Sequence, residues 1–209
     1  MAATGLFAFI TVSLMIIMTP GQDTLLTVRN TLTGGRVAGW LTAVGVAGGQ
    51  LTWTLAASAG LSAVLLAYPS AFAAIRVAGA AYLVLLGAQS VRAAVSQRRL
   101  STERFEPGEA IGRPAYVRQG LLSNLGNPKM LLFFTGLLPQ FAGGGRAIDL
   151  VILGLTFCLL TLSWLCLYAT AVAKLGELFS KPKFWRTLEG ATGLGLVALG
   201  LRVASDAAL

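Results

Sequence analysis

The sequence predicts an all-α integral membrane protein with six transmembrane helices. They form two inverted three-helix halves, each beginning with an interrupted helix. Three observations lead to this prediction. The chain is 56% hydrophobic and 11% charged, whereas soluble domains are about 25% charged. Its apolar residues fall in six runs long enough to cross a bilayer, and proline interrupts the first and the fourth. A water-soluble domain of 209 residues could not bury so much apolar surface.

Breaker residues divide the first half. The first segment, 5–33, has no charged side chain before Asp23, and Pro20-Gly21 interrupts it just ahead of that acid. Charge is then absent from residue 37 to residue 75, too long for one crossing at about 1.5 Å per residue. Pro69 is therefore expected to divide this stretch into the second segment, 37–66, and the third, 70–91.

A polar stretch with proline and glycine breakers, 92–114, is expected to be a cytoplasmic linker between the halves. The fourth segment, 115–141, is interrupted at Asn127-Pro128, matching the break in the first segment. The fifth and sixth segments are 148–173 and 184–203. Because each half has an odd number of segments, the second half enters the membrane inverted. We expect one transporter domain over 1–209, built from halves 1–91 and 115–209.

The basic residues predict the orientation. Of the sixteen lysines and arginines, twelve lie in loops on one side, three lie on the other, and Lys129 lies inside the fourth segment. Cytoplasmic loops are enriched in Lys and Arg, so the N-terminus is expected outside in a plasma (inner) membrane protein. Lipid headgroups then account for the net charge of +8, and no nucleic-acid partner is expected. The N-terminal run lacks a basic n-region and is interpreted as a retained first span.

Paired breaks at matching places in two halves indicate a transporter's central site. A non-helical backbone segment is tolerated inside a membrane only where its N–H and C=O groups find hydrogen-bond partners in the protein or in a water-filled cavity. Asp23 and Lys129 follow the two breaks, and ionisable groups inside membranes are functional by default. We expect them near the midplane on facing helices, where they would complement a zwitterion. Two plainer interpretations stay open: Asp23 caps its own helix, and Lys129 snorkels to the cytoplasmic headgroups.

Other polar residues extend this candidate site. Gly120, Asn124 and Asn127 are spaced i, i+4, i+7, on one helix face. Gln50 lies in the second segment, where Gly45 and Gly49 permit close helix packing. The alternative for Gln50 and Asn124 is interhelical hydrogen bonding, which we favour over ligand contact. The residues expected to bind substrate are Asp23, Gln50, Asn124, Asn127 and Lys129, and those expected to break the helices are Pro20, Gly21 and Pro128.

The composition excludes much enzyme and metal chemistry. His is absent, which removes the commonest metal ligand and the usual proton shuttle near neutral pH. Cys158 and Cys166 would lie about 12 Å apart on one helix, too far for a disulfide within it, and are expected to be packing residues. No GxxxxGK[ST] loop is present, so the chain alone hydrolyses no ATP. No cofactor, metal or enzymatic activity is expected.

Two stretches resemble the LysE/RhtB family of amino-acid exporters. TPGQDTLLTVRNTLTGGRVAGWLTAVGVAGGQ has a Pro-Gly-x-Asp break, a Gly-Arg loop and a Gly-rich second span. GLLSNLGNPKMLLFFTGLLPQF has Asn-Pro-Lys with Pro-Gln-Phe close behind. The likeness covers nearly the whole chain, although Gln22 stands where the family commonly has a second proline. The resemblance implies proton-coupled export of amino acids or related metabolites, and it extends to Pro20, Gly21, Asp23, Asn127, Pro128 and Lys129.

We therefore expect a secondary active exporter of amino acids or related small zwitterionic metabolites that works by alternating access, with protons as the coupling ion. In this hypothesis, Lys129 and the helix N-terminal ends hold the substrate carboxylate, and Asp23 binds the amine or exchanges the proton. The alternatives are a membrane channel, a scaffold, a cation exporter or an intramembrane enzyme with Asp23 and Lys129 as acid and base. The small-residue faces also permit a homodimer.

Overall fold

The computed structural model describes residues 3–61, 69–95, 112–142, 146–179 and 182–208, and all regular elements in these ranges are helical. This confirms the predicted all-α class. The elements in chain order are α1 (Ala3–Met18), α2 (Gln22–Ala56), η1 (Ala57–Leu61), α4 (Pro69–Val95), α5 (Arg113–Leu125), α6 (Pro128–Leu132), η3 (Phe133–Leu137), η4 (Leu138–Phe141), α7 (Ala147–Phe179) and α8 (Pro182–Ala208). Most of the predicted linker, 96–111, lies outside the described residues.

The breaks fall where the prolines predict them. α1 ends at Met18 and α2 begins at Gln22, while α5 and α6 are separated by Gly126 and Asn127. Pro69 is the first residue of α4, a position that suits its missing N–H.

The expected loop between the first two segments is instead a kink inside α2, at Gly35. Its φ of 75° lies in the left-handed region that glycine adopts without strain. This kink divides α2 into a first limb, 22–34, and a second limb, 36–56.

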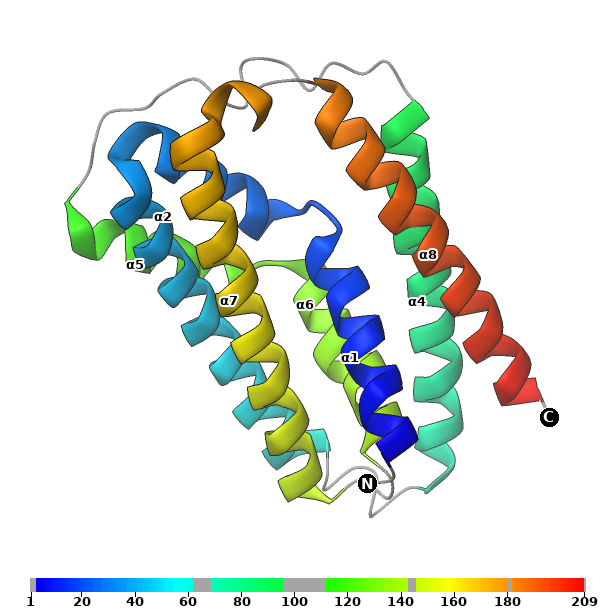
Figure 1. Ribbon diagram of the computed structural model, residues 1–209. Coiled ribbons are helices and arrows are strands. Elements are labelled where there is room, and N and C mark those ends of the chain that lie inside the picture. Colours follow the sequence, from blue (N-terminus) through cyan, green and yellow to red (C-terminus); the bar gives the residue numbers. More distant parts are fainter. Residues whose placement is uncertain (1–2, 62–68, 96–111, 143–145, 180–181, 209) are drawn as a thin grey trace.

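The helices pack in two groups with α1 and α6 between them (Figure 1). The second limb of α2 packs against α5 and α7, and α4 packs against α8. Small residues permit the close α4–α8 contact, because a Cβ atom on Gly87 would lie 2.7 Å from the Gly193 carbonyl oxygen. Gly193 of α8 is therefore a packing residue, and Gly200 meets Val84 in the same way.

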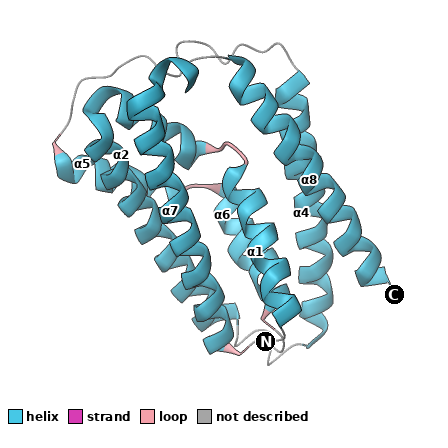
Figure 2. Cartoon of the chain, viewed as in Figure 1, coloured by secondary structure: helices cyan, strands magenta, loops and turns pink. Residues whose placement is uncertain are grey.

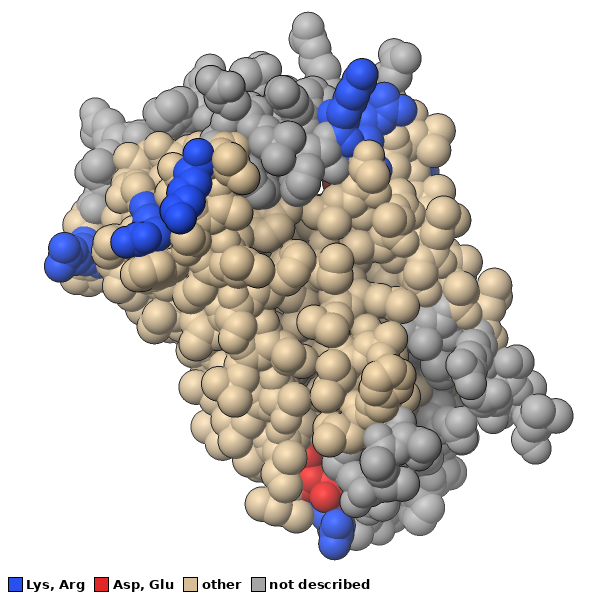
Figure 3. Space-filling model, viewed as in Figure 1, with Lys and Arg blue, Asp and Glu red and all other residues tan. Residues whose placement is uncertain are grey.

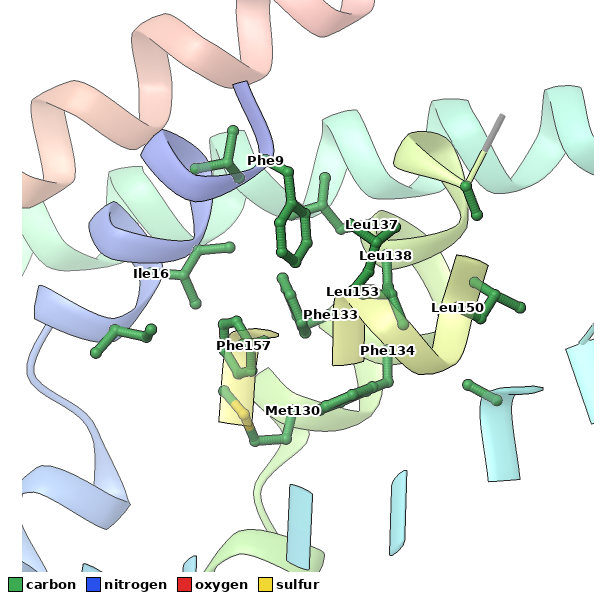
Figure 4. Close-up of a cluster of buried hydrophobic side chains, with 14 of the residues drawn as sticks. Phe9, Ile16, Met130, Phe133, Phe134, Leu137, Leu138, Leu150, Leu153 and Phe157 are labelled. Atoms are coloured by element: carbon green, nitrogen blue, oxygen red, sulfur yellow. The ribbon is translucent and has the colours of Figure 1, made fainter. Parts of the chain in front are cut away.

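An apolar cluster fills the space between α1, α7 and the segment that follows the second break (Figure 4). Phe133 stacks on Phe157 with ring centroids 4.0 Å apart, and Phe134 meets both rings edge-on. Phe9 and Ile16 of α1 are fully buried in this cluster. It fixes α1 and α6 against α7 and thereby sets the positions of the chain ends at both breaks.

The outer surface suits a lipid environment. α7 exposes large aliphatic side chains along its length, including Ile148, Leu159 and Leu167. By length and apolarity, Ala147–Leu175 qualifies as a membrane span among the described helices, and the pair Gly5–Met18 and Gln22–Gly60, bent by 54°, qualifies as a second, broken span. The six-span inverted topology therefore stays a prediction.

Charge gathers at the two ends of the molecule (Figure 3). Basic side chains lie at the upper end, where α5 and α8 begin and α4 and α7 end. The exposed residues there are Arg36, Arg92, Arg113, Lys174, Lys183 and Arg186. The ion pair between Arg146 and Asp149 lies at the lower end, where α7 begins. On the face shown, the described residues between these ends carry no charged side chain at the surface.

Candidate functional site

The two helix breaks lie together in the middle of the molecule (Figure 2). At the first break, Pro20 supplies no N–H, and the N–H and hydroxyl of Thr19 both donate to the Met15 carbonyl. At the second, Asn127 has the extended backbone expected of a residue before proline, with φ −83° and ψ 111°. Hydrogen bonds between the two breaks, described below, confirm that they are neighbours.

Asp23 lies in the first turn of α2 and bonds to the second half of the chain. Its carboxylate is 8% exposed. Ser123 Oγ donates to Oδ1 at 2.7 Å. Asn124 Nδ2 and Asn127 Nδ2 donate to Oδ2 at 2.9 and 3.1 Å. The N-cap of α2 is Gly21 and has no side-chain cap bond, so the interpretation of Asp23 as a cap of its own helix is wrong.

Lys129 makes the opposite connection, from the second half to the first. Its Nζ donates to the carbonyl oxygens of Ile16 and Thr19, each at 3.1 Å. These carbonyls belong to the last turn of α1 and the break that follows it, where no further helical N–H is available. A cation also complements the negative end of the helix dipole. Lys129 therefore caps α1 rather than snorkelling to the headgroups.

Asn127 joins the two connections. Its Oδ1 accepts the backbone N–H of Lys129 at 3.0 Å, which caps α6. Its Nδ2 donates to Asp23. One amide side chain therefore closes the start of α6 and binds the acid of the other half.

Asp23 and Lys129 lie at neighbouring breaks but do not form a direct ion pair. Among the described residues, the salt bridge is that of Arg146 and Asp149. The hydrogen bonds of Lys129 go to carbonyl oxygens. The two opposite charges therefore lie near the same pair of breaks, and the hydrogen-bond partners of each are uncharged groups. A lysine ammonium has three N–H donors, of which two are used here.

Glycines provide the room for this arrangement. A Cβ atom on Gly21 would lie 3.1 Å from Lys129 Nζ, so the ammonium group rests against the backbone of the first break. On the second limb of α2, a Cβ atom on Gly45 would overlap the Val117 carbonyl, and one on Gly49 would meet Asn124. Gly120 faces the Thr42 carbonyl in the same close manner. Gly120 is therefore a packing residue on the face that it shares with Asn124.

The hydrogen bonds of Gln50 go to residues other than Asp23 and Lys129. Its Nε2 donates to Thr161 Oγ1 at 3.1 Å, which links α2 to α7, and it contacts Met130 Sδ at 3.8 Å. The favoured interhelical hydrogen bonds are thus confirmed for Gln50 and for Asn124. Of the five predicted binding residues, Asp23, Asn124, Asn127 and Lys129 belong to the site at the breaks. Gln50 adjoins it through Met130, the residue after Lys129.

Sequence reasoning missed Ser123. Its only signal is a polar residue beside Asn124 in an apolar run, and such serines often bond to their own helix. The carbonyl partners of Lys129 were also missed, because every residue carries a carbonyl. In the part of the chain that the structure describes, no group of three or more His, Cys, Asp or Glu side chains could hold a metal ion. Cys158 and Cys166 are both free thiols.

A helical membrane protein with two neighbouring helix breaks, each followed by one charged side chain, has the architecture of a transport protein. Comparison with known proteins agrees. The LysE type translocator family model matches residues 14–207, so the chain belongs to this family of exporters and is not an enzyme.

Two curated relatives illustrate the family. The uncharacterized membrane protein YrhP of Bacillus subtilis is 32% identical over 205 residues, covering 95% of this chain and 97% of its own. A leucine efflux protein of Salmonella typhimurium is 32% identical over 130 residues, covering 62% of this chain and 59% of its own. No solved structure matches the chain.

Proposed function

We propose that the protein is a secondary active exporter of amino acids that works by alternating access and is driven by the proton gradient. The observation that carries this proposal is the crossed bonding of the two breaks. Asp23 binds side chains of the second half, and Lys129 binds carbonyls of the first. If one half rocks against the other, the hydrogen bonds of Asp23 and Lys129 across the halves must break and re-form. The conformation of the protein is then coupled to the charges of these two side chains.

The two charges match a zwitterionic amino acid. Asp23 provides the acceptor for the substrate ammonium group. Lys129 has one N–H beyond the two that cap α1, and this donor suits the substrate carboxylate. The first turn of α2 adds a partial positive charge beside it. When a zwitterion binds, hydrogen bonds of Asp23 and Lys129 within the protein would thus be replaced by hydrogen bonds of the same kind to the substrate.

An apolar side chain on the substrate fits the surroundings. Met130 follows Lys129 directly, Phe133 lies one helical turn further on, and both are buried. Trp53 donates its Nε1 hydrogen to the Asn124 carbonyl at 3.4 Å. The described interior near the breaks has no further charged group for a basic or acidic substrate side chain. A leucine efflux protein is among the relatives. Leucine and similar apolar amino acids are therefore the first substrates to test.

The membrane arrangement follows from the charge pattern. The basic end of the molecule is proposed to face the cytoplasm, and the opposite end, with the N-terminus, to face outward.

The test is efflux of radiolabelled amino acids from proteoliposomes, with and without an imposed pH gradient. We expect saturable, gradient-driven efflux that Asp23→Asn and Lys129→Met each abolish. Asp149→Asn and Lys174→Met are matched controls at the two ends of the molecule and should retain efflux. Flux that survives both central substitutions would remove the site from the mechanism. Flux that does not saturate, or ignores the gradient, would indicate a channel.

A further inference from the structure

We propose that the coupling proton binds Asp23 at Oδ1, and that the Ser123 hydroxyl permits this by changing from hydrogen-bond donor to acceptor. This inference rests on the proposed proton-coupled export and deepens it. It starts from the unequal surroundings of the two carboxylate oxygens. Oδ1 meets one hydroxyl group, whereas Oδ2 meets two amide groups.

The amide groups keep Oδ2 an acceptor. Asn127 cannot turn its amide around without loss, because its Oδ1 accepts the backbone N–H of Lys129 at 3.0 Å. Its Nδ2 therefore points to Asp23, and an amide nitrogen donates only. Asn124 Nδ2 donates to the same carboxylate oxygen at 2.9 Å, although its own Oδ1 is buried without a hydrogen-bond partner among the described residues. A proton on Oδ2 would confront these N–H groups, so this oxygen remains the carbonyl oxygen of the protonated acid.

Ser123 can reverse its role. Its hydroxyl donates to the Asp23 carboxylate at 2.7 Å, but the same oxygen has lone pairs that can accept. When a proton arrives from water and binds Oδ1, the hydroxyl rotates about its C–O bond and accepts the new O–H of Asp23. Its own hydrogen then turns to the carbonyl of the preceding helical turn, a usual partner of helical serines.

The exchange is balanced. A hydronium ion gives one proton to Oδ1, so one of its O–H bonds breaks, the O–H bond of Asp23 forms and a water molecule is released. Asp23 loses its negative charge, and Ser123 stays neutral with its own O–H bond intact. All three hydrogen bonds of Asp23 persist in both states. Proton uptake therefore takes no partner away from the three groups around Asp23, and leaving a buried group unpaired would cost free energy.

Among the described residues of the packed elements, Lys129 is the charged residue that lies at the breaks with Asp23, and its ammonium group rests against Gly21. On α5, Arg118 is exposed and Tyr116 lies two turns before Ser123. On α7, Tyr168 packs against the first limb of α2. α1 has no titratable side chain. The hydrogen-bond partner of Oδ1 is the Ser123 hydroxyl, which can stay bonded to the neutral acid as an acceptor.

The test measures protonation directly, independent of transport. Infrared difference spectra of the purified full chain, recorded as the pH is stepped, show the carbonyl stretch of protonated carboxyl groups. The Asp23 band is the one missing in Asp23→Asn. We expect Ser123→Ala to move its titration midpoint to higher pH by about half a unit to one unit. The anion loses a charge-assisted bond, which is stronger than the bond that the neutral acid loses.

Two further variants separate this role from a structural one. Ser123→Thr keeps the hydroxyl and should restore the wild-type midpoint. Ser58→Ala removes another buried hydroxyl, which bonds to the Thr54 carbonyl, and should leave the Asp23 band unchanged.

An unchanged midpoint in Ser123→Ala, or an Asp23 band that does not titrate while the protein stays folded, would overturn the proposal. Efflux measured on the same variants tests export separately. A shifted midpoint without any amino-acid flux would retain Ser123 and reject the exporter. Coupled flux with an unshifted midpoint would retain the exporter and reject Ser123.

Discussion

Asp23 is held by neutral donors only, and this determines what its substitutions should do. An asparagine at this position has nearly the shape of the protonated acid. Its Oδ1 can accept from Asn124 and Asn127, and its Nδ2 can donate to the Ser123 hydroxyl. We expect Asp23→Asn to change the free energy of unfolding by no more than about 1 kcal/mol while gradient-driven efflux is lost.

Asp23→Leu is the contrasting variant, because it leaves the buried donors of Ser123, Asn124 and Asn127 without an acceptor. Each unpaired donor destabilises a protein by about 1–3 kcal/mol. Thermal unfolding in detergent should therefore show a much lower midpoint for Asp23→Leu than for Asp23→Asn. Equal midpoints would mean that the three donors find other partners.

Gly21 is needed for the space it leaves and not for its backbone conformation. Its φ of −145° and ψ of −172° suit any residue, but a Cβ atom would press on Lys129 Nζ. We expect Gly21→Ala to lower the free energy of unfolding by about 1 kcal/mol, because the ammonium group must move away from its two carbonyl acceptors. Thermal unfolding measures this loss.

The sign of the Gly21→Ala effect should reverse when Lys129 is replaced. In a Lys129→Met background no ammonium is displaced, and alanine restricts the unfolded chain more than glycine does. The substitution should then be neutral or stabilising, by about 0.4–1 kcal/mol. An equal loss in both backgrounds would show that Gly21 acts through some other contact.

At the scale of elements, the second limb of α2 depends on glycine where it crosses α5. A Cβ atom on Gly45 would overlap the Val117 carbonyl, whereas one on Gly48 would meet Leu121 Cδ1 at an ordinary 3.6 Å. We expect Gly45→Ala to destabilise the protein by about 1–3 kcal/mol and Gly48→Ala to have little effect. The comparison of their unfolding midpoints checks this, because the two sites share a helix and a substitution.

The elements show what could be predicted from sequence. Pro20 and Pro128 give local signals, since proline removes a backbone donor, and both breaks were predicted. The sequence predicts a loop at Gly35 and not a kink inside a helix, because glycine occurs in both and the sequence does not distinguish them. Ser123 and the carbonyl partners of Lys129 were missed, since their role depends on which elements pack together. The side chains at the breaks were predictable because charge and amides are rare in apolar runs.

At the scale of the whole molecule, the separation of charge predicts orientation. Arg36 lies at the basic end and Arg146 at the opposite end. In a background with Cys158 and Cys166 replaced by alanine, a membrane-impermeant thiol reagent should label Arg146→Cys in intact cells. It should label Arg36→Cys only after the membrane is opened. The reverse pattern would invert the proposed topology.

The crossed bonds at the two breaks also constrain how the protein is made. The carboxylate of Asp23 and the open carbonyls of α1 are synthesised about a hundred residues before their partners at Ser123 to Lys129. During that interval the first half holds a charge and a broken backbone that nothing in its own sequence completes. We therefore expect both breaks to close together when the second half arrives, so that the central contacts form only once the chain is nearly complete.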